Sequence, residues 1–163
     1  MIKKLLHQIQ NGYTRSNMKQ PEYFYHQSGV IPYRIIKGKI FILLITSRSK
    51  GHWIIPKGII ETGLSPEKSA LKEAIEEAGI LGEIIGDVVA RYDVTKWEDV
   101  CHVQLYLMKV TEIFDIWEEQ DFRKRQWVEL KAVPKIVKKK KLRKIFKTLK
   151  KDPNNFSDKL LPF

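Results

Sequence analysis

The chain has few of the features that would place it outside the ordinary globular proteins. Cys101 is the only cysteine among 163 residues, which excludes an internal disulfide and a cysteine-based zinc cluster. No stretch reaches the roughly 18–20 apolar residues that a membrane span needs, and the first residues lack the apolar core of a signal peptide. We therefore expect no membrane span and a cytoplasmic location.

Glycine and proline are also scarce, at 9 and 7 residues, whereas 43% of the chain is hydrophobic. This composition excludes disordered, collagen-like and low-complexity chains. The length fits a single domain that can bury a sizeable core. We expect a variable lead-in at 1–22, one folded domain at 23–151 and a short tail at 152–163.

Acidic residues are scarce in one part of the chain. The 30 Lys and Arg outnumber the 19 Asp and Glu, and residues 131–163 hold +10 of the +11 net charge. Lys138–Lys141 opens this basic stretch. It predicts a solvated helix face, a nucleic-acid contact through residues 135–151, or a field that attracts polyphosphate. The sequence carries no signal for an oligomeric state.

The apolar pattern predicts alternating strands and helices. Two β-rich runs at 28–36 and 39–46 flank a short turn with glycine and predict a hairpin. The other expected elements are strands at about 83–93, 101–111 and 126–128 and helices at 66–78 and 134–151. This order predicts an α/β sandwich, in which helices cover both sides of a mixed sheet.

The first of these helices has clear end signals. Ser65 is a good N-terminal cap, Pro66 suits the first helical position, and Gly79 suits the end. An apolar stripe of mostly small residues runs between them at helical spacing: Ala70, Leu71, Ala74, Ile75 and Ala78. Small residues on this face predict close packing against the sheet.

Three glutamates share one face of the same helix. Glu73, Glu76 and Glu77 lie at i, i+3 and i+4, where like charges repel. Lys57 and Gly58 form a tight loop just before the helix, which can aim a backbone carbonyl at this face. Oxygen ligands of this kind suit Mg²⁺ or Mn²⁺. The alternative is an acidic surface face without a ligand.

This pattern resembles the signature of the Nudix hydrolases: Gly, five residues, Glu, seven residues, Arg-Glu, an aliphatic, any residue, Glu-Glu, any residue, Gly, an aliphatic. The residues in register are Gly58, Glu73, Ala74, Glu76, Glu77, Gly79 and Ile80. Leu64 departs from the first Glu of the signature, and Lys72 departs from its Arg. Glu61 is a candidate replacement for the missing acid.

The resemblance implies the Nudix α/β/α sandwich and hydrolysis of a diphosphate by water attack at phosphorus, with Mg²⁺ or Mn²⁺ as cofactor. Glu73 and Glu77 would be the principal metal ligands, together with the Lys57 carbonyl in the Gly58 loop. Glu76 would bind a further ion. The general base stays open between Glu73, Glu76 and an acid from a loop. Apart from the resemblance, the acidic residues before Trp127 predict a solvated loop or an extra metal ligand or base, for which Glu119 is the preferred candidate.

Three further segments, 28–34, 45–58 and 117–128, resemble the branch that includes diphosphoinositol polyphosphate phosphohydrolases and diadenosine polyphosphate hydrolases. In that branch Arg34, Ser47, Arg48 and Lys124 would lie near the substrate's phosphates. Two other functions stay open. One is an RNA 5′-end pyrophosphohydrolase, and the other is a catalytically weak module that binds nucleotide or RNA.

Overall fold

The structure is a computed structural model that describes residues 25–96 and 98–156. The lead-in expected at 1–22 and the end of the tail from residue 157 lie outside the described residues. The strands are β1 (His26–Ile36), β2 (Lys39–Thr46), β3 (Trp53–Ile54), β4 (Lys57–Ile59), β5 (Ile80–Lys96), β6 (Asp99–Ile113) and β7 (Arg125–Glu129). The helices are α2 (Pro66–Glu73), α3 (Val133–Ile136) and α4 (Lys140–Lys151).

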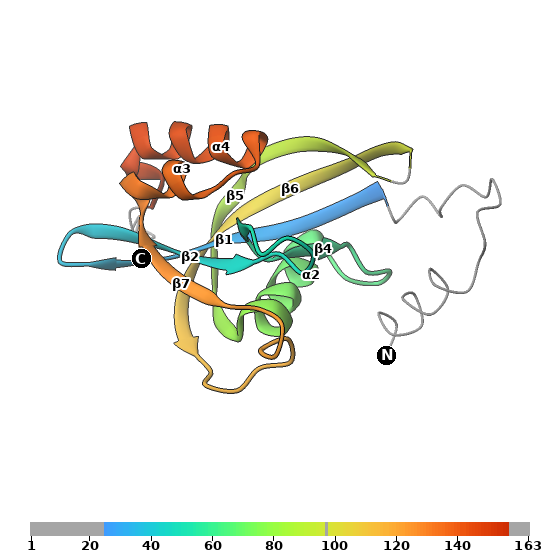
Figure 1. Cartoon of the computed structure of the whole chain (residues 1–163), viewed down its shortest axis with the longest axis horizontal. Coiled ribbons are helices and arrows are strands. Elements are labelled where there is room, and N and C mark those ends of the chain that lie inside the picture. Colours follow the sequence, from blue (N-terminus) through green and yellow to red (C-terminus); the bar gives the residue numbers. More distant parts are fainter. Residues whose placement is uncertain (1–24, 97, 157–163) are drawn as a thin grey trace, which may run out of the picture.

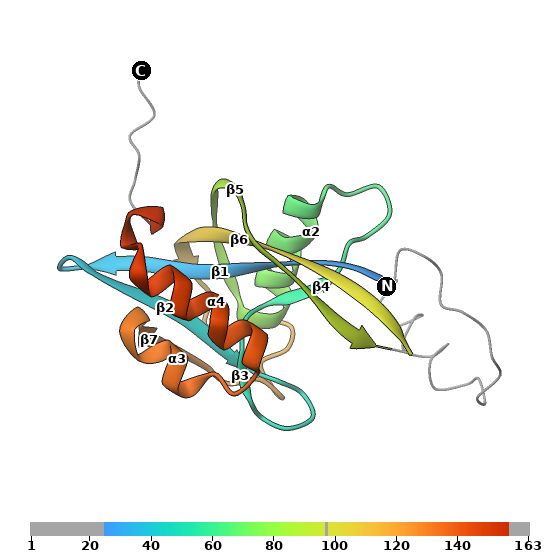
Figure 2. The same ribbon diagram turned by 90° about the horizontal axis from the view of Figure 1, so that it is seen from above.

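One mixed sheet holds all seven strands. Its main order is β3-β2-β1-β6-β5, while β4 pairs with β1 and β7 pairs with β2. The pair β1 and β6 is parallel, and the other pairs are antiparallel. Helix α2 lies on one face of the sheet, and α3 and α4 lie on the other (Figures 1 and 2). The predicted α/β sandwich is confirmed.

The predicted hairpin of 28–36 and 39–46 is confirmed, and the strands expected at 83–93 and 101–111 are longer than predicted and form a second hairpin. β1 and β2 pair antiparallel on either side of Lys37-Gly38. β5 and β6 form a long hairpin whose register shifts between Leu81 and Gly82 and between Ile85 and Ala90. Within the described part of the chain, no helix is long and apolar enough to cross a bilayer.

Each face of the sheet has its own core. On the α2 side, Ala70, Ala74 and Ala78 are fully buried, so the small residues do bring the helix close to the sheet. On the α4 side, the buried face consists of Leu142, Phe146 and Leu149. Phe156, in a 3₁₀ turn at Pro153–Phe156, is also buried there, and its ring packs edge-on against Tyr33 at 5.1 Å.

The single helix expected at 134–151 is wrong, because the chain breaks between α3 and α4. Val137 is extended (φ −74°, ψ 119°), and its N–H donates to the Val133 carbonyl and completes α3. Arg143 Nε donates to the Val137 carbonyl at 2.9 Å, which stabilises the break. The adjacent Lys138–Lys141 adds like charges at a helix N-terminus, where the helix dipole disfavours cations.

Candidate active site

The glutamate helix changes its form where the glutamates begin. Helix α2 ends at Glu73, and Ala74–Ala78 forms a π-helical turn that stops at Gly79 in the left-handed region. In a π turn an N–H bonds the carbonyl five residues back, which shifts the residues that follow around the helix. Glu73 and Glu77 are both buried, whereas Glu76 is half-buried.

The π turn also corrects one residue of the predicted stripe. Ile75 is 40% exposed, although α-helical spacing placed it with the buried alanines. The N–H of Gly79 accordingly points to the carbonyls of Ala74 and Ile75. The single α-helical face predicted for Glu73, Glu76 and Glu77 is thus divided between two buried carboxylates and one at the edge.

The two buried carboxylates converge on Lys57 and Gly58, which begin strand β4 and do not form the tight loop predicted for them. The Lys57 N–H donates to Glu77 Oε2 at 3.2 Å. Glu73 lies against Gly58 so closely that a Cβ added to Gly58 would lie 2.2 Å from Glu73 Oε1. Glycine is therefore required here by the approach of a carboxylate, which is the reason for the Gly at this position of the pattern.

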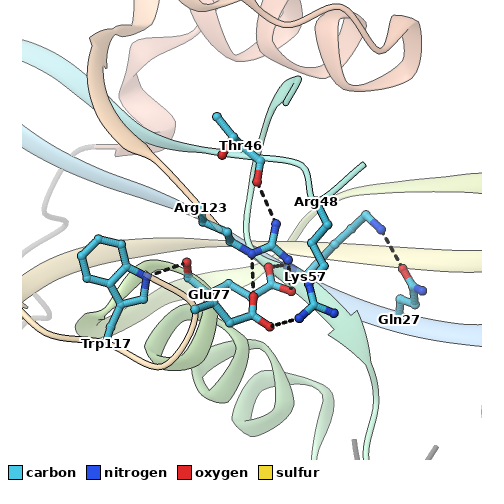
Figure 3. Close-up of polar contacts among 8 residues, drawn as sticks. Gln27, Thr46, Arg48, Lys57, Glu77, Trp117 and Arg123 are labelled. Atoms are coloured by element: carbon cyan, nitrogen blue, oxygen red, sulfur yellow. Dashed lines mark hydrogen bonds and ion pairs between the residues drawn. The ribbon is translucent and has the colours of Figure 1, made fainter. Parts of the chain in front are cut away.

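The Lys57 side chain leads away from the glutamates. Its Nζ donates to Gln27 Oε1 at 2.9 Å, on the side of the loop away from Glu77 (Figure 3). Burial, together with the nearby Lys96 and Lys139, lowers the pKa of Lys57 to about 8. The backbone of Lys57 thus faces the acids, while its ammonium lies among other cations.

Lys72, one of the two departures from the Nudix signature, forms an ion pair with Glu61, which lies three residues before the other departure, Leu64. Lys72 Nζ lies 2.6 Å from Glu61 Oε1 and 3.5 Å from Glu76 Oε1. The hydrogen bond that Lys72 Nζ donates to Glu61 is the main reason why the pKa of Lys72 is raised. The Glu61 N–H also donates to Ser69 Oγ at 3.0 Å, which fixes the loop on the helix. Glu61 therefore supplies a carboxylate that Leu64 does not.

The buried side chain of Arg123 links Glu119 to Glu77 of the glutamate helix. Arg123 Nε lies 2.5 Å from Glu119 Oε2, and Arg123 NH2 lies 3.3 Å from Glu77 Oε1. Figure 3 shows Arg123 between Thr46 and Glu77. The sequence interpretation gave Arg123 no role, although Glu119 and Arg123 at i and i+4 are a common ion-pair spacing.

One segment, residues 114–125, caps the C-terminal end of the glutamate helix. The last four carbonyls of a helix lack partners within it. Here the carbonyls of residues 76–79 accept from the Glu119 N–H (3.1 Å), Trp117 Nε1 (3.2 Å), Arg125 NH1 (2.8 Å) and the Phe114 N–H (2.8 Å). Arg125 also stacks on the Trp117 ring at 3.9 Å.

The predicted substrate residues fall into two places. Ser47, Arg48 and Lys124 lie together, because the Thr46 N–H donates to the Lys124 carbonyl and Arg48 lies 3.6 Å from Glu119. Ser47 Oγ accepts from the His52 N–H and so closes a turn. Arg34 lies apart, on β1 opposite Phe41, with its guanidinium 4.1 Å above the Trp127 ring.

The groups that could bind a metal here are the carboxylates of Glu73 and Glu77 and the Lys57 backbone carbonyl. Oxygen ligands of this kind suit a hard divalent cation. Glu73 and Glu77 already meet at Lys57 and Gly58. Across residues 25–96 and 98–156, however, no three Asp, Glu, His or Cys side chains are arranged as a metal cluster. Glu76 lies near Lys72, and Glu119 pairs with Arg123.

Comparisons with known proteins agree with this geometry. A family model described as the NUDIX domain matches residues 27–149. Nudix hydrolase 21, chloroplastic, of Arabidopsis thaliana is 37% identical over 107 residues, which cover 63% of this chain and 54% of that protein. Diphosphoinositol polyphosphate phosphohydrolase 3-beta of Bos taurus is 29% identical over 120 residues, or 72% and 71% of the two chains.

The fold has solved counterparts as well. A C. elegans Ap4A hydrolase in a binary complex superposes with a TM-score of 0.70 at 24% identity, over 81% of this chain and 99% of that one. The chain spans about half the length of the Arabidopsis relatives that match it at 37% and 32% identity. Because the domain match covers most of the chain and includes the glutamate helix, the protein belongs to the Nudix family.

Proposed function

We propose that the protein is a metal-dependent hydrolase that cleaves a diphosphate linkage by attack of water at phosphorus. The observation that carries the proposal is the meeting of two buried carboxylates, Glu73 and Glu77, at Lys57 and Gly58 of a Nudix domain. Burying two acids together is costly unless a cation compensates them, and a divalent ion bound there would do so.

Some residues of the site would bind the metal, and others would support the site or act as the general base. Glu73, Glu77 and the Lys57 carbonyl would hold Mg²⁺ or Mn²⁺, and Glu76 would help to hold a further ion. A bound divalent ion orients water and neutralises charge on the phosphate oxygens. Glu61 pairs with Lys72 and braces the loop, while Glu76 lies near the same lysine and Glu119 pairs with Arg123. The general base stays open between Glu73, Glu76 and a loop acid such as Glu119.

The substrate would place its phosphates beside Ser47, Arg48 and Lys124, because these residues gather next to Glu119 at the end of β2. Arg48 and Lys124 are exposed, so both cations are accessible to phosphate oxygens. Arg34 would bind a more distant phosphate from its place on Trp127. The substrate class is a diphosphoinositol polyphosphate, a dinucleoside polyphosphate or another nucleoside diphosphate derivative. The single cysteine favours a cytoplasmic location.

The test is hydrolysis of a substrate panel with Mg²⁺ or Mn²⁺ by the wild-type chain and by Glu77→Gln. The substitution keeps the side chain's shape and removes its charge, so we expect activity to fall about a hundredfold with the fold intact. Glu67→Gln, on an exposed position of the same helix, is the matched control. A wild-type chain that binds nucleotides but hydrolyses none of the panel would favour the weak binding module.

A second candidate function, contact with nucleic acid, is favoured by one feature of the α3–α4 face. A hollow of about 480 Å³ is lined by Pro134 and five cations: Lys131, Lys135, Arg143, Lys147 and Lys150. An RNA 5′-end pyrophosphohydrolase would grip its substrate's backbone here. Turnover of triphosphorylated RNA would then fall steeply with salt, whereas turnover of a small diphosphate would not. Equal salt dependence for both substrates would exclude this function.

A further inference from the structure

Arg123 is a buried cation whose three guanidinium nitrogens have different partners. Its side chain is 7% exposed, and arginine is rarely buried this deeply unless it is paired. Nε lies 2.5 Å from Glu119 Oε2, NH2 lies 3.3 Å from Glu77 Oε1, and NH1 donates to the Thr46 carbonyl at 2.8 Å. Figure 3 shows how Arg123 joins the helix to the end of β2.

The partners of Arg123 belong to three separate parts of the fold, and each part is fixed independently. Glu77 accepts from the Lys57 N–H, and the Glu119 N–H donates to the Glu76 carbonyl. The Lys124 N–H donates to Thr46 Oγ1 at 2.9 Å, so the residue after Arg123 is also fixed. The guanidinium therefore cannot shift without moving the loop, the helix or the strand.

The planar guanidinium does two things that one point charge cannot do. It places a cation between two carboxylates that would otherwise repel each other in a buried site. It also directs separate N–H groups to each acid, so the acids are held at one separation. Glu119 comes from a loop about forty positions beyond Glu77, and Arg123 is the group that links the two side chains.

We propose that Arg123 is a positioning residue that holds the loop acid Glu119 and the helix acid Glu77 in one arrangement, so that both serve the same reaction centre. This inference rests on the proposed hydrolase function and adds a residue to its machinery. Lysine would keep the positive charge but not the fork of donors, so Arg123→Lys separates geometry from charge.

Arg125 provides a matched comparison two positions along the chain. Its guanidinium donates to the carbonyls of Ala78 (2.8 Å) and Phe114 (2.7 Å) and stacks on Trp117. These contacts are with backbone groups and an aromatic ring. Arg125 therefore stabilises the same segment as Arg123 without bridging the two acids, and Arg125→Lys reports what loss of support for the segment does by itself.

The experiment compares Arg123→Lys and Arg125→Lys in the full chain. Binding of Mn²⁺ without substrate is measured by electron paramagnetic resonance, together with kcat and KM on a diphosphate that the wild type hydrolyses, and with Tm. We expect Arg123→Lys to weaken Mn²⁺ binding and lower kcat about tenfold each, with KM nearly unchanged. Arg125→Lys should lower Tm and leave Mn²⁺ binding and kcat close to the wild-type values.

Three results would decide against the proposal. Wild-type Mn²⁺ binding and kcat in Arg123→Lys would show that the fork of donors is not needed. Equal losses of Mn²⁺ binding and of kcat in Arg123→Lys and Arg125→Lys would show that Arg123 supports the loop and does not position the acids. A wild-type chain that neither binds Mn²⁺ nor hydrolyses the panel would instead refute the proposed function, and the role of Arg123 with it.

Discussion

The two ends of the glutamate helix are held by different means. At the N-terminal end, Ser65 Oγ accepts from the Lys68 N–H at 3.2 Å and Pro66 occupies the first turn, so the partners are a few residues apart. At the C-terminal end, the partners lie far along the chain: Trp117 is 40 positions from Glu77, and Arg125 is 47 from Ala78. The first end is local, and the second depends on the tertiary fold.

This difference concerns function, because Glu76 and Glu77 lie at the non-local end. The segment 114–125 that caps this end also carries Glu119 and Arg123. The same contacts that satisfy the last carbonyls therefore bring a loop acid to the helix acids. A change that displaces Glu119 or Arg123 is expected to affect both stability and the site, whereas a change at Ser65 is expected to affect stability alone.

The largest expected effect comes from Gly79→Ala at the non-local end. Gly79 has φ 63°, which costs an L-residue about 1–2 kcal/mol. An added Cβ would also lie 2.6 Å from Trp117 Cβ and 3.0 Å from Arg125 NH1, and such overpacking adds about 1–3 kcal/mol. We expect urea denaturation to show a loss of about 3 kcal/mol in the free energy of unfolding.

Gly63→Ala is the matched control for this prediction. Gly63 has a φ of 85°, yet an added Cβ would have nothing within 4 Å. Gly63→Ala should therefore lower the free energy of unfolding only by the cost of the left-handed backbone conformation, about 1–2 kcal/mol. Equal losses at the two glycines would show that the contact of segment 114–125 with the helix end is not tight.

The local end should be less sensitive, and Ser65→Ala measures it. The substitution removes the acceptor of the Lys68 N–H at an exposed position, where water replaces part of the bond. We expect a loss of about 1 kcal/mol in the free energy of unfolding, with hydrolysis unchanged. Ser65→Asp keeps a side-chain acceptor and should restore most of the stability. A loss in Ser65→Ala as large as that in Gly79→Ala would contradict the comparison.

The same division explains how much the sequence could predict. The hairpin of β1 and β2, the mixed sheet and the start of the glutamate helix follow from turn residues, caps and apolar runs, which act over a few positions. Gly79 marks where this helix stops, but not the contacts that hold its end. The π turn was not predicted, since hydrogen bonds from the distant segment 114–125 stabilise it. The break at Val137 was missed because Arg143, from the next helix, stabilises it.

In the candidate site, too, the features that depend on nearby residues were predictable and those that depend on the tertiary fold were not. The spacing predicts that the glutamates of the helix face Lys57 and Gly58, which agrees with the positions of Glu73 and Glu77. Glu61 is expected as a replacement for the missing acid, and its contact of 2.6 Å with Lys72 identifies the cation that it meets. The bridge of Arg123 between Glu77 and Glu119 has no counterpart in spacing, because it requires β2, the helix and the loop to meet.

The smallest expected effect concerns the ion pair of Glu61 and Lys72 at the local end. A double-mutant cycle with Glu61→Gln and Lys72→Met measures their coupling in the free energy of unfolding. The Lys72 side chain is 42% exposed, so we expect only about 0.5 kcal/mol at neutral pH, despite the short contact. Lys68→Met, at an exposed position of the same helix, controls for the loss of a lysine.

The pH dependence of this coupling tests its origin. The hydrogen bond that Lys72 donates to Glu61 raises the pKa of Lys72 above its ordinary 10.5, so the folded state favours the protonated amine. The coupling should therefore be fully present below about pH 10 and disappear as the pH rises through the raised pKa. A coupling that persists at higher pH would come from packing and not from the ammonium. In that case Glu61 would not replace the acid that Leu64 lacks, and Ser65 would be the main support of this end.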